Sequence, residues 1–409
     1  MKMKAVFVGF GARSQCYADY LFTNGNSFEV AAASDPKDFL RKLAVEKYHC
    51  PSEHVYPDWR EMLKNGVQGD LLFVCTQDNF HVEPAIEAMK VGYRQLMVEK
   101  PIDKDIDKCR QLAEAAAQYG ATVQVCHSLR YNNFYRRLKQ LLDSGRIGTI
   151  SCINHLEGVG TFHYAHSFVR GDWCNDAKSP MILQKCCHDT DLLVWLTGKR
   201  CRSLSSYGSL EFFKPENAPE GCTDRCIDGC RYNSTCPYSA MKYLSKYKDH
   251  AFREYAVEKE GFTDTAEALR KGRYGRCVFH CDNNVVDHQV VDLLFEGGIT
   301  ATLTMCGFSN FGRETHIMGT MGEIRAYMSD DRIEVYDFRT GDKEVYHVAH
   351  PDALHGGADY ILVQDFIKCA LGEKEPATQI AESIHSHVIA MAAEKSRLEG
   401  RTVSLAELG

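Results

Sequence analysis

The segment Met3–Phe22, MKAVFVGFGARSQCYADYLF, joins a continuous apolar run to a pair of glycines and then to apolar residues at helical spacing. This order predicts a buried strand, a tight turn and a helix. In a dinucleotide fingerprint the first glycine allows the turn and the second lets backbone N–H groups approach a pyrophosphate, while Ser14 replaces the usual third glycine. The alternative is an ordinary strand turn. The predicted cofactor-binding loop comprises Gly9, Gly11, Ala12, Arg13 and Ser14.

The next apolar strand, FEVAAASD, ends in Asp35. A carboxylate at this position can accept hydrogen bonds from the adenosine ribose, and its charge would repel the 2′-phosphate of NADP, so NAD is the expected cofactor. The alternative role for Asp35 is to cap a helix in which Pro36 takes the first helical position.

Further apolar strands, DLLFVC, QLMVEKP and ATVQVCH, alternate with the helical segments HVEPAIEAMKVG and DIDKCRQLAEAAAQYG. This alternation predicts an α/β fold with a parallel doubly wound sheet. Cofactors bind at the carboxyl ends of such strands. The segments CTQDNFH (Cys75–His81) and VEKPID (Val98–Asp103) are therefore expected to border the cofactor.

Length and composition limit the kind of partner. A chain of 409 residues exceeds the size at which one hydrophobic core usually keeps growing, so two domains are expected. The net charge of −7 and the lack of a Lys/Arg block argue against nucleic acid, and no stretch has the length and apolarity of a membrane span. The N-terminus reads as a strand rather than a signal peptide, and the 18 cysteines read as reduced thiols, which predicts a cytoplasmic protein with a small-molecule substrate.

Several motifs occur together: GFGARS, CTQDNFHVEPAIEAMKVG, MVEKPI, RYNNFYRRLKQLLDSGRIGTI, CCHDTDLLVWL and MGTMGEIRAYM. This combination resembles the Gfo/Idh/MocA family of sugar oxidoreductases over nearly the whole chain, apart from an insertion at about residues 214–284. The resemblance implies a Rossmann domain over residues 1–127 and an α/β domain over residues 128–409. The second domain would have an open, mainly antiparallel sheet with one face on the cofactor and the other used for homo-oligomerisation.

The later sequence agrees with that expectation on its own residues. Short β-rich runs such as TISCINHLEG, ITATLTMCGF and GEIRAYM are separated by glycine or charged turns, which predicts a sheet. Two amphipathic helical segments, GADYILVQDFIKCAL and TQIAESIHSHVIAMAAEKSRLEG, then close the chain.

The resemblance also implies catalytic residues. In relatives the lysine of Glu-Lys-Pro lies beside the nicotinamide and the reacting carbinol, so Lys100 is the first catalytic and substrate-binding candidate, held by Glu99 and Pro101. His188 is the second, because it lies between Gln184 and Asp191 on one face of a helix predicted to begin near Leu183. The alternatives are a solvated lysine and a core histidine.

One position departs from the family pattern. Family dehydrogenases usually carry an aspartate four residues before this histidine, whereas this chain has Gln184 followed by Lys185. A glutamine can orient an imidazole but cannot stabilise its protonated form as a carboxylate does. Asp191 or Lys185 could take over part of that role, or the proton chemistry differs.

Other matches are supporting, and each could equally be a capping or packing residue. Thr76, Asn79 and His81 align with the loop that touches the cofactor. Arg130 and Tyr131 are expected to begin a helix at the domain junction, and the substrate candidates also include Tyr164 and His355.

The insertion is rich in cysteine. Cys222, Cys226, Cys230 and Cys236 are separated by three, three and five residues, which differs from the C-x-x-C pairs of common zinc ribbons. The surrounding segment has few apolar residues, so a structural zinc ion is expected, with Cys277 or Cys281 as alternative ligands. An iron–sulfur cluster and free thiols are the alternatives.

Three functions are compatible with these residues. The leading one is an NAD(H)-dependent oxidoreductase acting on a secondary alcohol of a sugar, cyclitol or glycoside. The second is a glycoside-cleaving enzyme that recycles tightly bound NAD through a keto intermediate, elimination, hydration and re-reduction. The third is a non-catalytic, regulatory sugar- or NAD-binding protein.

Overall fold

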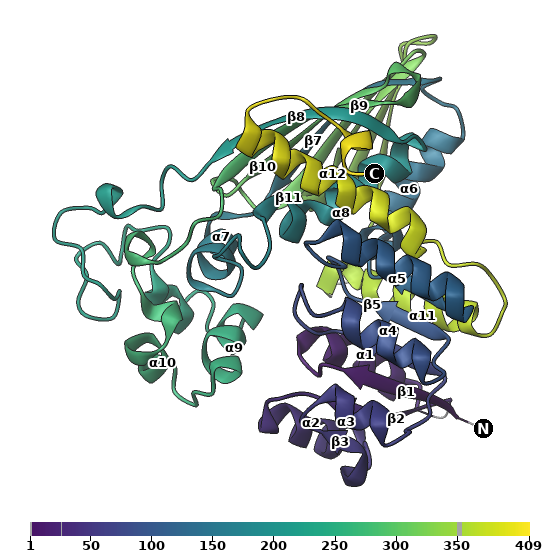
Figure 1. Ribbon diagram of the computed structural model, residues 1–409. Helices are drawn as coiled ribbons and strands as arrows, with labels where there is room; N and C mark the ends of the chain where they lie inside the picture. Colours follow the sequence, from purple (N-terminus) through teal and green to yellow (C-terminus); the bar gives the residue numbers. More distant parts are fainter. Residues whose placement is uncertain (1, 26, 350–353) are drawn as a thin grey trace.

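The computed structural model describes residues 2–25, 27–349 and 354–409, and these residues form a six-stranded and a nine-stranded sheet (Figure 1). The first sheet has the order β3-β2-β1-β4-β5-β6, and all its strand pairs are parallel. This confirms the predicted doubly wound α/β domain. Its strands are β1 (Met3–Val8), β2 (Phe28–Ser34), β3 (Val55–Tyr56), β4 (Leu71–Val74), β5 (Gln95–Val98) and β6 (Thr122–Val125).

The helices that alternate with these strands are α1 (Ala12–Thr23), α2 (Asp38–Tyr48), α3 (Trp59–Lys64), α4 (Val82–Lys90) and α5 (Ile106–Tyr119). The strand order reverses between β1 and β4, and the carboxyl ends of the strands at such a point form the ligand crevice of a doubly wound fold. Helix α2 begins at Asp38 rather than at Pro36, because Lys37 is still extended and its N–H is bound by the Asp35 carboxylate.

The nine-stranded sheet has the order β14-β13-β12-β11-β7-β10-β9-β8-β15. Among the described strand pairs of this second sheet, only β7–β10 is parallel, so the prediction of a mainly antiparallel sheet is confirmed. Strand β8, rich in serine, was not among the strands expected from the sequence; it pairs along its length with β9. The strands are β7 (Ile150–Gly158), β8 (Cys201–Ser209), β9 (His288–Phe295), β10 (Thr300–Cys306), β11 (Gly312–Gly319), β12 (Gly322–Tyr327), β13 (Arg332–Asp337), β14 (Lys343–His347) and β15 (Val403–Ser404).

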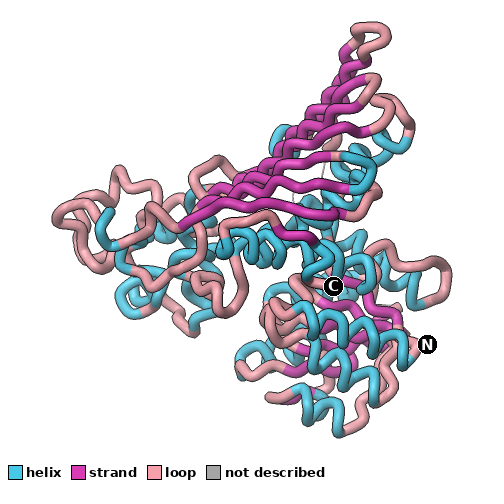
Figure 2. Tube along the Cα trace, turned by 45° about the horizontal axis from the view of Figure 1, so that its top comes forward, coloured by secondary structure: helices cyan, strands magenta, loops and turns pink. Residues whose placement is uncertain are grey.

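Helices cover one face of this sheet (Figures 1 and 2). Helix α8 (Met181–Thr197) packs against α12 (Ile380–Glu399), and the two contact β7, β8 and β10. Helix α6 (Asn133–Asp143) follows the domain junction, and the short α7 (Thr161–Tyr164) follows β7. The opposite face carries exposed side chains such as Leu294 and Tyr336. None of the described helices is both long and apolar enough to cross a membrane.

Helix α11 (Ala358–Ala370) returns from the second domain to the first. Its Leu362, Val363 and Phe366 are buried in the same apolar cluster as Phe7 and Phe73 of the parallel sheet. The ring centroids of Phe73 and Phe366 are 5.5 Å apart. The core of the Rossmann domain is therefore completed by a helix encoded more than two hundred residues after its last strand.

The insertion connects β8 to β9 and contains α9 (Ala251–Val257) and α10 (Thr265–Lys271) (Figure 1). It has an apolar cluster of its own, but the buried members come mostly from residues after the cysteine-rich stretch: Phe162, Cys226, Ala240, Tyr243, Ala256, Val257, Ala268, Leu269 and Tyr274. The insertion also touches the Rossmann domain, where Lys37 Nζ donates to the carbonyl of Lys259 over 3.0 Å.

Candidate functional site

The glycine turn fits a bound phosphate. Gly9 has φ +81° and a Cβ there would lie 2.7 Å from the carbonyl oxygen of Cys75, so only glycine suits this position. Ser14 Oγ donates to the carbonyl of Gly9. Gly11 precedes α1, no described side chain caps the helix, and no described atom lies within 4 Å of the place a Cβ would take. The first N–H groups of α1 are thus open to an anion.

Asp35 lies beside this turn and is 8% exposed. Its Oδ2 accepts the N–H of Phe10 over 2.9 Å, and its Oδ1 accepts the N–H of Lys37 over 2.9 Å. The carboxylate therefore joins the end of β2 to the glycine turn, next to the predicted phosphate site, and also forms the local turn that precedes α2.

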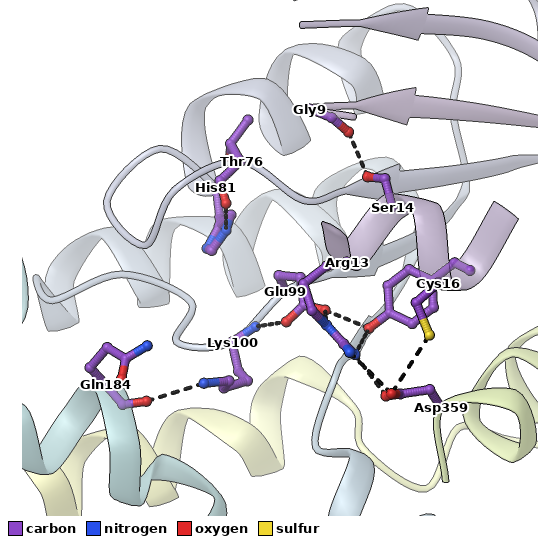
Figure 3. Close-up of polar contacts among 11 residues, drawn as sticks. Gly9, Arg13, Ser14, Cys16, Thr76, His81, Glu99, Lys100, Gln184 and Asp359 are labelled. Carbon is purple, nitrogen blue, oxygen red and sulfur yellow. Dashed lines mark hydrogen bonds and ion pairs between the residues drawn. The ribbon is translucent and has the colours of Figure 1, made fainter. Parts of the chain in front are cut away.

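Arg13 enters a buried ion-pair network (Figure 3). Its Nε lies 2.7 Å from Glu99 Oε1, and its terminal nitrogens donate to both carboxylate oxygens of Asp359 over 3.0 and 2.7 Å. Glu99 also accepts the hydroxyl of Tyr17. Burial raises the pKa of Glu99, but the Arg13 charge and the hydrogen bonds outweigh that effect and hold the pKa below its usual value. Arg13 thus links three separate parts of the chain.

Lys100 bridges the two domains (Figure 3). It follows β5 and forms a cis peptide bond with Pro101. Its N–H donates to Glu99 Oε2 over 3.1 Å, while its Nζ donates to the carbonyl of Gln184 on α8 over 3.1 Å. The ammonium group is therefore held at the carboxyl end of the parallel sheet, against the helix that carries His188.

The loop after β4 is organised by His81, which is 1% exposed. Its Nδ1 lies 2.8 Å from the carbonyl oxygen of Pro101 and its Nε2 lies 2.9 Å from that of Thr76. Thr76 Oγ1 donates to the carbonyl of Phe80, and Asn79 lies in the same loop. His81 therefore ties together the two strand-end loops that carry the predicted cofactor contacts.

Asp78 is a site residue that the sequence analysis did not name. Burial raises the pKa of its carboxyl group, although the charges of Lys100 and His81 and a hydrogen bond from Trp173 act in the opposite direction. A buried carboxyl next to a lysine is a common feature of proton-transfer sites. Its position in the segment CTQDNFH, at the carboxyl end of a parallel strand, could have identified it from the sequence.

His188 lies in a group of three histidines. It is 6% exposed, and its ring centroid lies 6.1 Å from that of His127, which in turn lies 5.8 Å from that of His387 on α12. His127 Nε2 is 3.8 Å from Asp191 Oδ1, and burial lowers the pKa of His127 to about 4. His127 follows β6, so the rule that singled out the loops after β4 and β5 would also have found it.

Asp191 forms an ion pair with Arg130, which lies at the junction of the two domains. Arg130 donates to both of its carboxylate oxygens over 2.7 Å, and Tyr131 donates to Asp365 over 2.9 Å. Arg130 and Tyr131 lie in a 3-10 turn, Ser128–Tyr131, rather than at the start of the following helix, because Asn132 caps α6.

Lys185 faces the large sheet, with its Nζ 3.1 Å from Glu157 Oε1. Glu157 and Asp189 both pair with Arg313 on β11. Burial raises the pKa of Asp189, but the charge of Arg313 and the hydrogen bond with His155 outweigh that effect and lower the pKa. This buried cluster supports α8 from the side of the sheet.

Tyr164 and His355 were predicted to contact the substrate, and the structure describes the side chain of Tyr164 alone. Tyr164 is fully buried, and its hydroxyl donates to the carbonyl of Val286 over 2.9 Å, so it packs the base of the insertion. His355 lies in the 3-10 turn Leu354–Gly357, but its side chain falls outside what the structure describes.

The structure does not bring the four cysteines Cys222, Cys226, Cys230 and Cys236 into one group of ligands. The ligand atoms that lie within 4.8 Å of one another belong to Cys222, Cys277 and His280. Cys281 is adjacent, and its Sγ donates to the carbonyl of Cys277. His280 was not a candidate in the sequence analysis, although it lies within the segment GRCVFHC that supplied the alternative ligands.

Replacement of His387 by glutamine tests the burial of the histidine group. His387 Nε2 accepts the N–H of Ile102 over 2.8 Å, and burial lowers its pKa to about 3 from the ordinary 6.5. Between those values the unfolded chain binds a proton that the folded chain does not, so the free energy of unfolding falls as the pH drops from 6.5 towards 4. H387Q should make this dependence shallower by roughly 1 kcal/mol per pH unit, measured by urea unfolding.

The exposed imidazole of His347 on β14 provides the matched control. H347Q is expected to keep the wild-type dependence. Equal slopes for H387Q and wild type would contradict a neutral, buried His387.

Comparison with protein families supports the fold and its chemistry. Residues 3–127 match the profile of an oxidoreductase family with an NAD-binding Rossmann fold, and residues 139–405 match the C-terminal alpha/beta domain of that family. A putative oxidoreductase, YteT, from Bacillus subtilis (strain 168) is 23% identical over 352 residues, covering 81% of this chain and 80% of that protein. Inositol 2-dehydrogenase from Salmonella typhimurium is 24% identical over 209 residues, covering 51% of this chain and 58% of the enzyme.

Solved structures share the whole architecture. An oxidoreductase from Agrobacterium radiobacter, in complex with NAD+, L-tartaric acid and magnesium, aligns with a TM-score of 0.72 and 14% identity, covering 100% of both chains. Scyllo-inositol dehydrogenase from Lactobacillus casei, with bound NAD(H) and scyllo-inositol, aligns with a TM-score of 0.70 and 17% identity, covering 99% of this chain and 100% of the other. At these identities the likeness establishes the fold.

Proposed function

Because this chain belongs to the Gfo/Idh/MocA family of NAD-binding oxidoreductases, we propose that it transfers a hydride between NAD(H) and a secondary alcohol of a cyclitol, sugar or glycoside. The relatives that are named inositol dehydrogenases favour a cyclitol as the first substrate class to test. The expected cytoplasmic location and homo-oligomer stay predictions.

The observation that carries this proposal is the position of Lys100. Its Nζ reaches from the carboxyl end of β5 to the carbonyl of Gln184, 3.1 Å away on the helix that carries His188. The ammonium is thereby held, at the edge where a doubly wound sheet binds its cofactor, against the helix of the second domain that carries His188. A lysine and a histidine at this edge would be suitable groups for acid–base chemistry on a substrate hydroxyl.

The residues present fit NAD. The open N-terminus of α1 after Gly11 would hold the pyrophosphate, and Asp35 would face the adenosine ribose. When bound, the nicotinamide supplies a hydride acceptor or donor.

In alcohol oxidation the protein has to accept the hydroxyl proton and to stabilise the negative charge that develops on the substrate oxygen. His188 would take the hydroxyl proton, and Lys100 would donate a hydrogen bond to the substrate oxygen as negative charge develops on it. The buried carboxylate of Glu99, bound to Arg13 and to the Lys100 N–H, would keep the lysine backbone in place. His127, in contact with His188 and close to Asp191, would help to orient the catalytic imidazole. That arrangement would supply part of what the absent family aspartate provides.

The test is an absorbance assay with the purified chain, NAD+ and a panel of myo-inositol, scyllo-inositol, monosaccharides and nitrophenyl glycosides. We expect NADH to accumulate with at least one polyol, in proportion to enzyme concentration. Release of nitrophenolate at constant NADH would instead indicate glycoside cleavage with a recycled cofactor. NAD+ binding without either signal would favour a non-catalytic binding protein.

A further inference from the structure

Two distant segments of the insertion lie side by side as a short antiparallel ladder. The N–H of Cys226 donates to the carbonyl of Gly275 over 3.1 Å, and the N–H of Cys277 donates to the carbonyl of Asp224 over 2.8 Å. Arg225 is the bridge partner of Arg276. This pairing brings the first cysteines of the insertion against its last helical turn.

The ladder gathers soft ligand atoms. The ligand atoms of Cys222, Cys277 and His280 lie within 4.8 Å of one another, and the Cys222 Sγ to His280 Nε2 distance is 3.9 Å. Thiolate and imidazole ligands of a tetrahedral zinc ion lie about 3.5–3.8 Å apart, so small side-chain rotations would suffice to bind one. Cys277 and His280 are separated by two residues, a spacing that is common for pairs of zinc ligands.

The second nitrogen of His280 also has a suitable neighbour. Nδ1 lies 3.0 Å from Asp224 Oδ1, while Nε2 faces the thiol of Cys222. Histidines that bind metals commonly have a carboxylate at the other ring nitrogen, which fixes the tautomer and the ring orientation. Asp224 belongs to the same ladder and can take this role.

A third thiol, which could supply the fourth ligand, lies nearby. Cys226 is 6% exposed, and its Sγ lies 4.0 Å from a terminal nitrogen of Arg170. Cys226 pairs with Gly275 in the same ladder in which Cys277 pairs with Asp224, so the backbones of Cys226 and Cys277 lie on adjacent strands of the ladder.

Arg170 supplies an independent argument about charge. It is 3% exposed, and its other described partners are the neutral carbonyls of Arg276 and Tyr238, at 2.7 and 2.8 Å, rather than a carboxylate. A buried guanidinium needs a compensating negative charge. A zinc ion with three thiolates and one neutral imidazole carries one net negative charge, which would lie next to Arg170.

We propose that Cys222, Cys277 and His280 hold a structural zinc ion, with Cys226 as the fourth ligand. The ion would add a link between the beginning of the insertion and its end, two parts that the small apolar cluster also joins through Cys226 and Tyr274. Cys230, Cys236 and Cys281 are not ligands. This site is separate from the oxidoreductase chemistry, so its test does not depend on activity.

The first test is the metal content of the purified full chain by mass spectrometry. We expect about one zinc ion per chain in wild type. At least a tenfold loss is expected in C222S, C226S, C277S and H280A, with wild-type content in C230S, the matched control from the same lobe. Wild-type zinc in H280A, or loss of zinc in C230S, would overturn the ligand assignment, and full retention in C226S would remove the fourth ligand.

A second measurement uses wild-type protein and so does not depend on whether the variants fold. The zinc is exchanged for Co²⁺, whose visible absorption reports geometry and thiolate ligands. Intense tetrahedral bands with sulfur-to-cobalt charge transfer support the site. Weak octahedral bands, the absorbance of an iron–sulfur cluster in the purified protein, or failure to bind either metal would overturn it.

Discussion

Replacing Lys100 with methionine is expected to lower kcat by about 10²–10⁴-fold, the usual contribution of a positioned acid–base group. Methionine keeps an unbranched apolar stem and the backbone N–H that donates to Glu99, but it removes the ammonium group that lies 3.1 Å from the carbonyl of Gln184. The transition state would then lose the hydrogen bond to the substrate oxygen. The measurements are steady-state kinetics on the best polyol and NAD+ binding by titration.

The matched control is K108M, because Lys108 is an exposed lysine on α5 whose nearest carboxylate, Asp103, is 3.8 Å away. K108M should keep wild-type kcat. NAD+ affinity and the unfolding midpoint should be unchanged in both variants. A K100M enzyme with full kcat would refute the assignment of Lys100 to the chemical step.

Replacing Arg13 with methionine is expected to destabilise the protein by about 3–5 kcal/mol, because it leaves two buried carboxylates without their common cation. The side chains of Glu99 and Asp359 are 6% and 2% exposed, and both lie 2.7 Å from Arg13 nitrogens. The loss should appear in denaturant unfolding of the chain without cofactor. It would also loosen α11 from α1, since Asp359 belongs to the first turn of α11.

The pH dependence of this loss has a definite sign. The folded-state pKa of Glu99 lies below its usual value, so its stabilising contribution is present at neutral pH and is lost as the pH falls through that folded pKa. The difference between R13M and wild type should therefore be largest at neutral pH and shrink in acid.

R60M is the control, because Arg60 pairs with Glu83 over 2.7 Å on the surface, with side chains 55% and 60% exposed. It should leave the free energy of unfolding close to that of wild type, because exposed ion pairs contribute little. Equal destabilisation by both variants would contradict the buried network.

The Rossmann domain was predictable because its signals are local. An apolar run of four to seven residues followed by a glycine or polar turn and a helical pattern specifies each strand except the two-residue β3, and parallel strands have to bury both faces. The glycine turn, Asp35 and the Glu-Lys-Pro segment could likewise be placed at strand ends from order alone. Strand β8 was not predicted because its serine-rich sequence is typical of a loop, and it forms a strand through its pairing with β9.

The amino-acid sequence by itself determined the fold class and the family, and it predicted which strand ends border the cofactor, since these depend on residues close together in the chain. Only the tertiary structure decided which side chains meet. It showed that Arg13, which stays a predicted cofactor contact, pairs with Glu99 and Asp359, and it placed His280 beside Cys222 and Cys277. Such contacts join residues as far apart as 346 positions, and local sequence patterns carry no information on them because packing of whole elements sets the distances.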